Sequence, residues 1–153
     1  MNRPFLTGRV DHTLDDKGRI TLPAAFRDLF VGESYFVPSA HGEPFLRLYD
    51  SFSWAAHDQR YLDSLDELGD READEQIGDL YEDMFIVSRD SQGRVTIPSD
   101  FIQKLGLKGK VRITGHRDHL RLWDPAVHQA YREARNRMKE AAERRRLAEV
   151  EDA

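Results

Sequence analysis

Two arginines stand at the end of the same short motif, and both could bind anions. Arg19 closes Asp15-Asp16-Lys17-Gly18-Arg19, and Arg94 closes Asp90-Ser91-Gln92-Gly93-Arg94. A guanidinium can bind a phosphate or a guanine edge through two hydrogen bonds, and strands can present such groups to a groove. The aspartate four residues earlier can cap the turn and orient the arginine. The pattern therefore indicates anion-binding turns, or surface turns in which Asp and Arg pair only with each other.

The second motif lies 75 residues after the first and belongs to a longer repeat. Over twelve positions starting at Asp15 and at Asp90, six residues are identical, where chance gives fewer than about one. A second block, Leu46-Arg47-Leu48-Tyr49-Asp50, recurs as Leu120-Arg121-Leu122-Trp123-Asp124. Two blocks in the same order at nearly the same spacing indicate an internal duplication.

Alternation after each turn predicts a half-buried strand. Ile20 and Leu22 lie on one face, and Arg19 and Thr21 on the other, so the arginine faces solvent; residues 94–97 repeat the pattern. A proline and a short amphipathic helix follow, with Gly32 and Gly106 as helix C-caps. The remaining strands of the two halves are predicted at residues 9–14, 35–38 and 45–49, and at 84–89, 111–114 and 120–123.

Two helical segments complete the chain. Apolar residues recur at helical spacing over 58–84, with a break near Gly69. Asp124 and Pro125 favour a helix start, and residues 126–150 are rich in helix formers, with last turns that we expect to be exposed or frayed. Because each half has only about 45 residues, we expect the halves to share one core.

Charge is distributed unevenly over the 153 residues. The formal net charge is −5, yet residues 55–85 alone contribute −9 and residues 86–124 contribute +4. The total therefore does not exclude a local basic face that binds nucleic acid. No apolar run is long enough for a membrane helix, and the first eight residues do not resemble a signal peptide. The absence of cysteine excludes disulfides and thiolate catalysis, so we expect a cytoplasmic protein.

Other chemistry has little support in the sequence. His116-Arg117-Asp118-His119 could hold a metal, but no third ligand accompanies it, and a solvated loop is the simpler interpretation. Asp15, Asp16 and Asp90 could form a carboxylate pair, although neighbouring arginines favour full ionisation. We predict no catalytic residue, no metal site, no cofactor and no small-molecule substrate. Trp54, Trp123 and Tyr131 are interpreted as packing residues.

The repeated pattern, Asp-x-x-Gly-Arg followed by a Thr strand, a proline, a short helix and Leu-Arg-Leu, resembles the SpoVT-AbrB family of swapped-hairpin DNA-binding modules. Two copies in about 150 residues resemble the MraZ family of regulators. The similarity implies an α+β fold in which two β-rich repeats form one pseudo-symmetric barrel, with a bridging helix and a C-terminal helix. It also implies domains at 5–54 (repeat 1), 55–83 (acidic bridging helical segment), 84–127 (repeat 2) and 128–153 (C-terminal helix).

The same resemblance implies a non-enzymatic, nucleoid-associated repressor of the bacterial division and cell-wall gene cluster. Its chains would form a homo-oligomeric ring that binds short direct repeats in double-stranded promoter DNA. The DNA-binding positions carried over from the family are Asp15, Lys17, Gly18 and Arg19 in the first copy, and Asp90, Gly93 and Arg94 in the second.

The second copy departs from the first in its charge. Gln92 replaces Lys17 and Ile102 replaces Arg27, so the second turn is expected to be less cationic. The first alternative function is an antitoxin-like interaction protein of the same fold, against which two fused repeats and a helical tail argue. The second alternative, an enzyme based on the carboxylates, lacks a converging set of residues.

Overall fold

The computed structural model describes residues 3–152, and the two halves of the chain repeat one order of elements. The strands are β1 (Arg9–Thr13), β2 (Arg19–Thr21), β3 (Glu33–Pro38), β4 (Leu46–Asp50), β5 (Phe85–Ser88), β6 (Arg94–Thr96), β7 (Lys110–Gly115) and β8 (Leu120–Trp123). The helices are the 3-10 helix η1 (Arg27–Leu29), α1 (Ser51–Ser64), α2 (Asp70–Glu82), α3 (Ser99–Leu105) and α4 (Pro125–Glu151). The prediction of an α+β protein is confirmed.

The main sheet interleaves strands from the two halves. Its order is β1-β7-β8-β4-β3-β5, and all its neighbours are antiparallel. The first strand of each half pairs with the third strand of the other, β1 with β7 and β5 with β3. The strands that follow the motif turns, β2 and β6, pair with each other in a separate two-stranded sheet. Neither half therefore completes its own sheet.

Equivalent residues of the two repeats face each other at two places. In the two-stranded sheet Ile20 pairs with Val95, and in the main sheet Arg47 pairs with Arg121. Each pair occupies matching positions of the repeat, so the two halves are related by an approximate two-fold axis through these pairings. The duplication inferred from the sequence is therefore expressed as a symmetry of the fold.

The principal core is shared by the two halves, as predicted. It contains Ile20, Leu22, Phe30, Phe36, Leu46 and Leu48 from the first half, and Val95, Ile97, Phe101, Val111, Ile113, Leu120 and Leu122 from the second. Most of these side chains are fully buried, which supplies the apolar burial that neither half reaches alone. A smaller cluster of Val37, Tyr49 and Trp54 anchors α1 to the sheet.

The main sheet is open in the described residues. Its order ends at β1 on one side and β5 on the other, so the closed barrel expected from the family resemblance is not found there. The strands at the two ends instead contact the small β2–β6 sheet, β1 against β2 and β5 against β6. The two sheets enclose the shared core between them.

The short helix predicted in both halves forms fully only in the second. There α3 ends at Gly106, whose φ of +64° provides the expected left-handed cap. In the first half only the 3-10 helix η1 forms, because its hydrogen bonds run from Leu29 N to Phe26 O and from Phe30 N to Arg27 O. Gly32 also has a positive φ, but the residue that ends η1 is Phe30.

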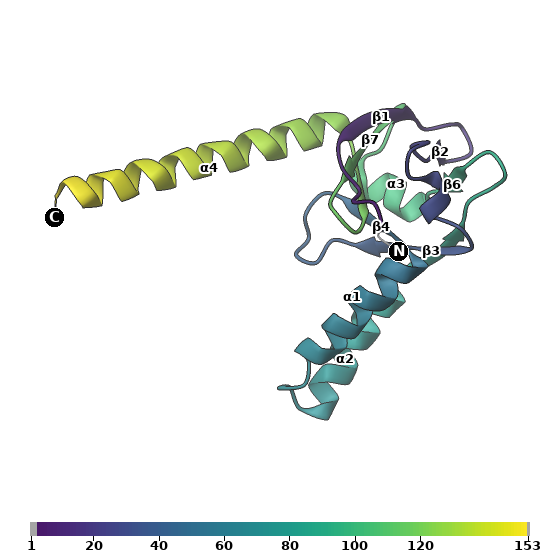
Figure 1. Cartoon of the computed structure of the whole chain (residues 1–153), viewed down its shortest axis with the longest axis horizontal. Coiled ribbons are helices and arrows are strands. Elements are labelled where there is room, and N and C mark those ends of the chain that lie inside the picture. The colour runs from purple at the N-terminus through teal and green to yellow at the C-terminus, as the bar shows by residue number, and fades with distance from the viewer. Residues whose placement is uncertain (1–2, 153) are drawn as a thin grey trace.

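The acidic bridge is a pair of helices rather than one. The first helix, α1, already begins at Ser51, because Asp50 accepts a hydrogen bond from the Ser53 backbone N–H and acts as its N-cap. The second, α2, begins after Gly69, where the predicted break falls. The two helices lie side by side and project from the body of the molecule (Figure 1).

The C-terminal helix α4 leaves the body as one long rod (Figure 1). Its start is as predicted, with Pro125 in the first turn and Asp124 accepting from Val127 N–H at 3.1 Å. Its last turns are exposed but remain helical to Glu151. Ala153, the last residue of the predicted tail, lies outside the described residues. Within residues 3–152, none of the helices combines the length and the apolar composition that a membrane span requires.

Candidate nucleic-acid interface

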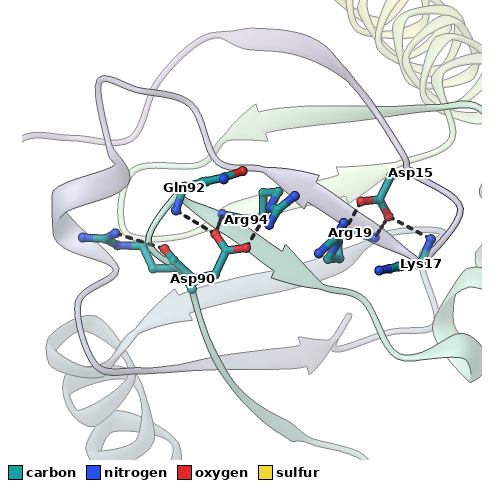
Figure 2. A network of polar contacts seen from close by, with 7 residues as sticks. Asp15, Lys17, Arg19, Asp90, Gln92 and Arg94 are labelled. Carbon is teal, nitrogen blue, oxygen red and sulfur yellow. Dashed lines mark hydrogen bonds and ion pairs between the residues drawn. The ribbon is translucent and has the colours of Figure 1, made fainter.

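The two motif arginines lie on the solvent face of the ribbon formed by β2 and β6. In its register Arg19 pairs with Thr96, Ile20 with Val95, and Thr21 with Arg94. Ile20 and Val95 point into the core, where each is 1% exposed. The alternation predicted from the sequence therefore places Arg19 and Arg94 on the opposite face. Figure 2 shows both arginines near the middle of the ribbon, with the two aspartate turns at its opposite ends.

The first turn is organised by one carboxylate. Asp15 Oδ1 accepts from the backbone N–H groups of Lys17 at 3.0 Å and Arg19 at 2.8 Å, while Oδ2 accepts from Arg19 Nε at 2.7 Å. The backbone closes the same turn, with Gly18 N–H donating to Asp15 O and Asp15 N–H donating to Arg19 O. The same aspartate therefore shapes the loop and orients the arginine.

The second turn reproduces this geometry. Asp90 Oδ1 accepts from the N–H groups of Gln92 and Arg94, each at 2.9 Å, and Oδ2 accepts from Arg94 Nε at 2.7 Å. The predicted site residues therefore form two sets, one in each turn: Asp15, Lys17, Gly18 and Arg19 in the first, and Asp90, Gly93 and Arg94 in the second. The predicted capping of each arginine by its own aspartate is confirmed.

A glycine is required in each turn. Gly18 has φ +77° and Gly93 has φ +79°, a left-handed conformation that other residues rarely adopt. Their carbonyl oxygens also extend the ribbon: Gly93 O accepts from Leu22 N–H and Gly18 O accepts from Ile97 N–H, both at 2.8 Å. Each turn is therefore tied to the end of the opposite repeat's strand.

Hydrogen bonding fixes the charge state of the turns. The pKa of Asp15 lies below its usual value, because its carboxylate accepts from Arg19, first from the backbone N–H and then from the side chain. The pKa of Asp90 is lowered by Arg94 for the same reasons. Both carboxylates are therefore ionised at neutral pH. A proton shared between them, as the carboxylate-pair alternative requires, is disfavoured.

Within the described residues, the Nη atoms of both guanidinium groups remain available as hydrogen-bond donors. Nε of Arg19 and Nε of Arg94 bind the aspartates, whereas in residues 3–152 neither arginine makes an Nη hydrogen bond within the chain. Both side chains are about one-quarter exposed, at 26% and 29%. Pre-oriented guanidinium groups with free Nη donors can bind a phosphate or a pair of acceptors on a base edge.

The expectation of a less cationic second turn is wrong. Arg27 of the first repeat lies across the second turn, where its side chain occupies the space that a Cβ on Gly93 would need. Its counterpart Ile102 lies against Gly18 of the first turn. Arg89 also joins the second turn through a hydrogen bond from Nη1 to Asp90 O at 3.5 Å. Arg27 is thus a cation that the first repeat contributes to the second turn, while Arg89 is contributed by the second repeat itself.

Thr21 and Thr96 complete the solvent face of the ribbon and were missed as site residues. Each pairs across the ribbon with one of the arginines, so arginine and threonine alternate over this face. Thr96 is exposed and Thr21 half-buried. The alternation that placed Arg19 on this face also places Thr21 there, so the sequence already contained the signal.

Other candidate sites are not assembled. The described residues contain no group of three or more His, Asp or Glu side chains able to hold a metal. His119, expected in a solvated loop, is instead buried, with its Nδ1 2.7 Å from Asp118 Oδ1. Trp54 packs on Tyr49, and Trp123 packs between Phe45 and Tyr131, which confirms that these aromatic residues are packing residues.

Comparisons with known proteins agree on one family. The family model described as "MraZ protein, putative antitoxin-like" matches residues 5–76 and 84–149. A transcriptional regulator MraZ from Gluconacetobacter diazotrophicus is 32% identical over 143 residues, which cover 88% of this chain and 89% of the relative.

Two further relatives have the same name. The protein from Leuconostoc citreum is 34% identical over 124 residues, which cover 81% of this chain and 84% of its own. The protein from Spiroplasma kunkelii is 29% identical over 138 residues, with 90% and 94% covered. The matches span both repeats and the segment between them. This chain therefore belongs to the MraZ family.

Proposed function

We propose that this chain is a sequence-specific, DNA-binding transcriptional regulator that contacts DNA through the β2–β6 ribbon. One observation carries the proposal: Arg19 and Arg94 lie on one face of a two-stranded ribbon, each held by an aspartate, with Nη donors that bind nothing within residues 3–152. The major groove of B-DNA admits a two-stranded ribbon, and arginine binds guanine bidentately within it. The relatives are named as transcriptional regulators, which supports the same role.

The finer parts of the proposal follow the family resemblance. We propose that the protein represses the division and cell-wall gene cluster from short direct repeats in its promoter, in the cytoplasm and on the nucleoid. Residues 5–54 and 84–127 are the two repeats, joined by 55–83 and followed by 128–153. The reciprocal strand pairing β1–β7 and β5–β3 supports a swapped-hairpin arrangement. The proposal includes no catalytic step.

We further propose that copies of the chain assemble through α4, which would dock on the α1–α2 pair of a second copy. Over 132–146 the helix has seven basic and three acidic side chains, whereas residues 51–83 have eleven acidic and two basic. Met138 and Val150 on α4, and Phe52 on α1, are exposed apolar residues available for such a contact. Because the two surfaces differ, the contact is head-to-tail and closes into a ring when the rotation permits.

The experiment is fluorescence anisotropy with DNA from upstream of the protein's own gene and with a shuffled control, at low and physiological salt. We expect preferential binding that survives physiological salt and is lost in Arg19→Ala and in Arg94→Ala. The melting temperature should change by no more than about two degrees, because a partly exposed ion pair contributes little stability.

Arg71→Ala is the matched control. Arg71 is an exposed arginine that also pairs with an acidic residue four positions away, but it lies on α2. We expect this variant to bind DNA as the wild type does. Equal binding to both DNAs, erased by salt, would contradict sequence-specific regulation. It would favour the antitoxin-like alternative that the family description names, and a partner protein would then be sought.

A further inference from the structure

Arg27 of the first repeat lies against the turn of the second. A Cβ added to Gly93 would stand 2.2 Å from Arg27 Nε and 2.4 Å from its Cδ. The guanidinium is tied down by Nη2, which donates to Leu22 O at 3.1 Å. Leu22 in turn donates its N–H to Gly93 O. The arginine, the end of β2 and the second turn therefore form one connected group across the two repeats.

The symmetry-related position shows that a cation is not needed merely to fill this space. At the first turn Ile102 takes the equivalent place, with its Cδ1 3.0 Å from a Cβ on Gly18. An apolar side chain is thus sufficient for packing against a motif glycine. A charged residue in the same place at the second turn has to be explained by something other than volume.

Arg27 is only partly satisfied within the chain. Its Nε is buried without a hydrogen-bond partner, and in residues 3–152 Nη1 makes no hydrogen bond. An unpaired buried donor costs free energy, so it calls for a compensating interaction. Arg27 as a whole is half-buried, so part of the residue remains accessible to a ligand.

The second turn also lacks the cation that the first turn has on its loop. Gln92 occupies the place of Lys17, and Figure 2 shows the two residues at opposite ends of the ribbon. The two differences compensate each other: the first turn has Lys17 with Ile102, and the second has Gln92 with Arg27. Besides Arg89, which belongs to the second repeat, the second turn therefore has a cation contributed by the first repeat.

We infer that Arg27 is a DNA phosphate-binding residue of the second turn, supplying the charge that Gln92 lacks. This inference rests on the proposed function, because the ligand is the same DNA that Arg94 contacts. The Arg27 side chain is hydrogen-bonded to Leu22 O and packs against Gly93. It presents Nη1 to a phosphate that flanks the bases contacted by the ribbon. Binding at the second turn thus depends on a residue from the first repeat.

The test compares the salt dependence of DNA binding in the full-length protein. Arg27→Gln should weaken binding several-fold and reduce the slope of log K against log salt by about 0.9 for each second turn engaged. Arg27→Lys, which keeps the charge, should retain the wild-type slope. Adding Gln92→Lys to Arg27→Gln should restore the slope, because it places a cation on the second turn as Lys17 does on the first.

Two controls separate the possible outcomes. Arg71→Gln removes the same charge far from the ribbon and should leave the slope unchanged. Arg27→Gln could weaken binding only to the extent that it lowers the melting temperature, leave the salt slope unchanged and show no rescue by Gln92→Lys. That result would identify Arg27 as a packing residue and overturn the inference. If the wild type binds no DNA, the proposed function fails; wild-type binding that Arg94→Ala abolishes and Arg27→Gln leaves intact overturns only this inference.

Discussion

His119 is held neutral by its surroundings at the turn between β7 and β8. Its Nε2 accepts from Arg121 Nε at 3.1 Å, so the ring proton lies on Nδ1, which is 2.7 Å from Asp118 Oδ1. The ring stacks on Tyr49 and is only 5% exposed. Burial is the main cause that lowers the pKa of His119 to about 4. Protonation would also turn the Nε2 acceptor into a donor facing an arginine.

This predicts a protein that loses stability in mild acid. The unfolded chain takes up a proton on this residue near its ordinary pKa of 6.5, and the folded chain only near 4. Lowering the pH between those values therefore favours unfolding, by on the order of 2 kcal/mol between about pH 7 and about pH 5. Burial also lowers the pKa of His57 and His128, which act in the same direction. Calorimetric melting temperatures at several pH values measure the effect.

His119→Gln provides the control for that prediction. A glutamine can still donate to Asp118 and accept from Arg121, but it does not titrate. The melting temperature of this variant should depend less on pH than that of the wild type, with a remaining slope from the other two histidines. A variant whose melting temperature falls as steeply as the wild type's would show that His119 is not responsible.

At the scale of single residues, local contacts could be predicted and cross-repeat contacts could not. The pairing of Asp15 with Arg19 follows from spacing, because both lie in one tight turn. The contact of Arg27 with Gly93 depends on which strands exchange between the repeats, and no local pattern encodes that exchange. The burial of His119 depends on Tyr49, a residue 70 positions earlier in the chain.

Among the elements, α4 shows the clearest division between an anchored part and a free part. His128 is buried, and Tyr131 packs on Trp123, whereas Met138, Leu147 and Val150 are at least half exposed. Helices in proteins derive most of their stability from packing, so the exposed part of α4 is the part that a partner would stabilise. In the proposed assembly, the acidic α1–α2 pair of another copy would supply both the charge and the apolar surface.

Truncation after Arg135 tests this role of α4. The shortened chain keeps the turns that pack on the body, so we expect a melting temperature near that of the wild type. We expect light scattering to show a smaller assembly, because the docking helix is missing. An unchanged assembly would place the interface elsewhere. Unchanged assembly with weakened DNA binding would show instead that the basic helix contacts DNA.

Element types were predictable where their signals are local. The Asp124 cap, Pro125 and the Gly106 cap correctly bounded α3 and α4. The prediction of a first short α-helix was wrong. The carbonyl groups of Pro23, Phe26 and Arg27 accept hydrogen bonds from the N–H groups three residues ahead, which gives the tighter 3-10 form. The start of α1 at Ser51 was also missed, although Asp50 has the same place in its repeat as the helix-capping Asp124.

For the whole molecule, the interleaved sheet makes the two halves dependent on each other. A chain that ends at Leu68 keeps β1, β2 and β4 but loses their partners β7, β6 and β8. It also loses the second half's share of the common core. We therefore expect this fragment to lack a cooperative unfolding transition by circular dichroism, whereas the full chain shows one. A sharp transition in the fragment would refute the shared core.

The shared core and the duplication were predictable from the sequence, but the sheet order was not. Periodicity showed which faces of the strands were apolar and that halves of about 45 residues could not stand alone. The order β1-β7-β8-β4-β3-β5 joins strands from opposite ends of the chain. The resemblance suggested a swapped hairpin with closure, whereas the pairing shows strands of the two repeats interleaved in an open main sheet.

The exchanged strands also set the order of events during synthesis. Arg9 of β1 finds its partner in Thr114 of β7, and β5 is needed before β3 is covered on both sides. The ribosome must therefore release most of the chain before the first strand can be paired, because contacts this distant in sequence form late and slowly. The nascent first half exposes apolar strands such as β4 throughout this interval. We therefore expect β1, the first strand to be made, to be among the last to be paired.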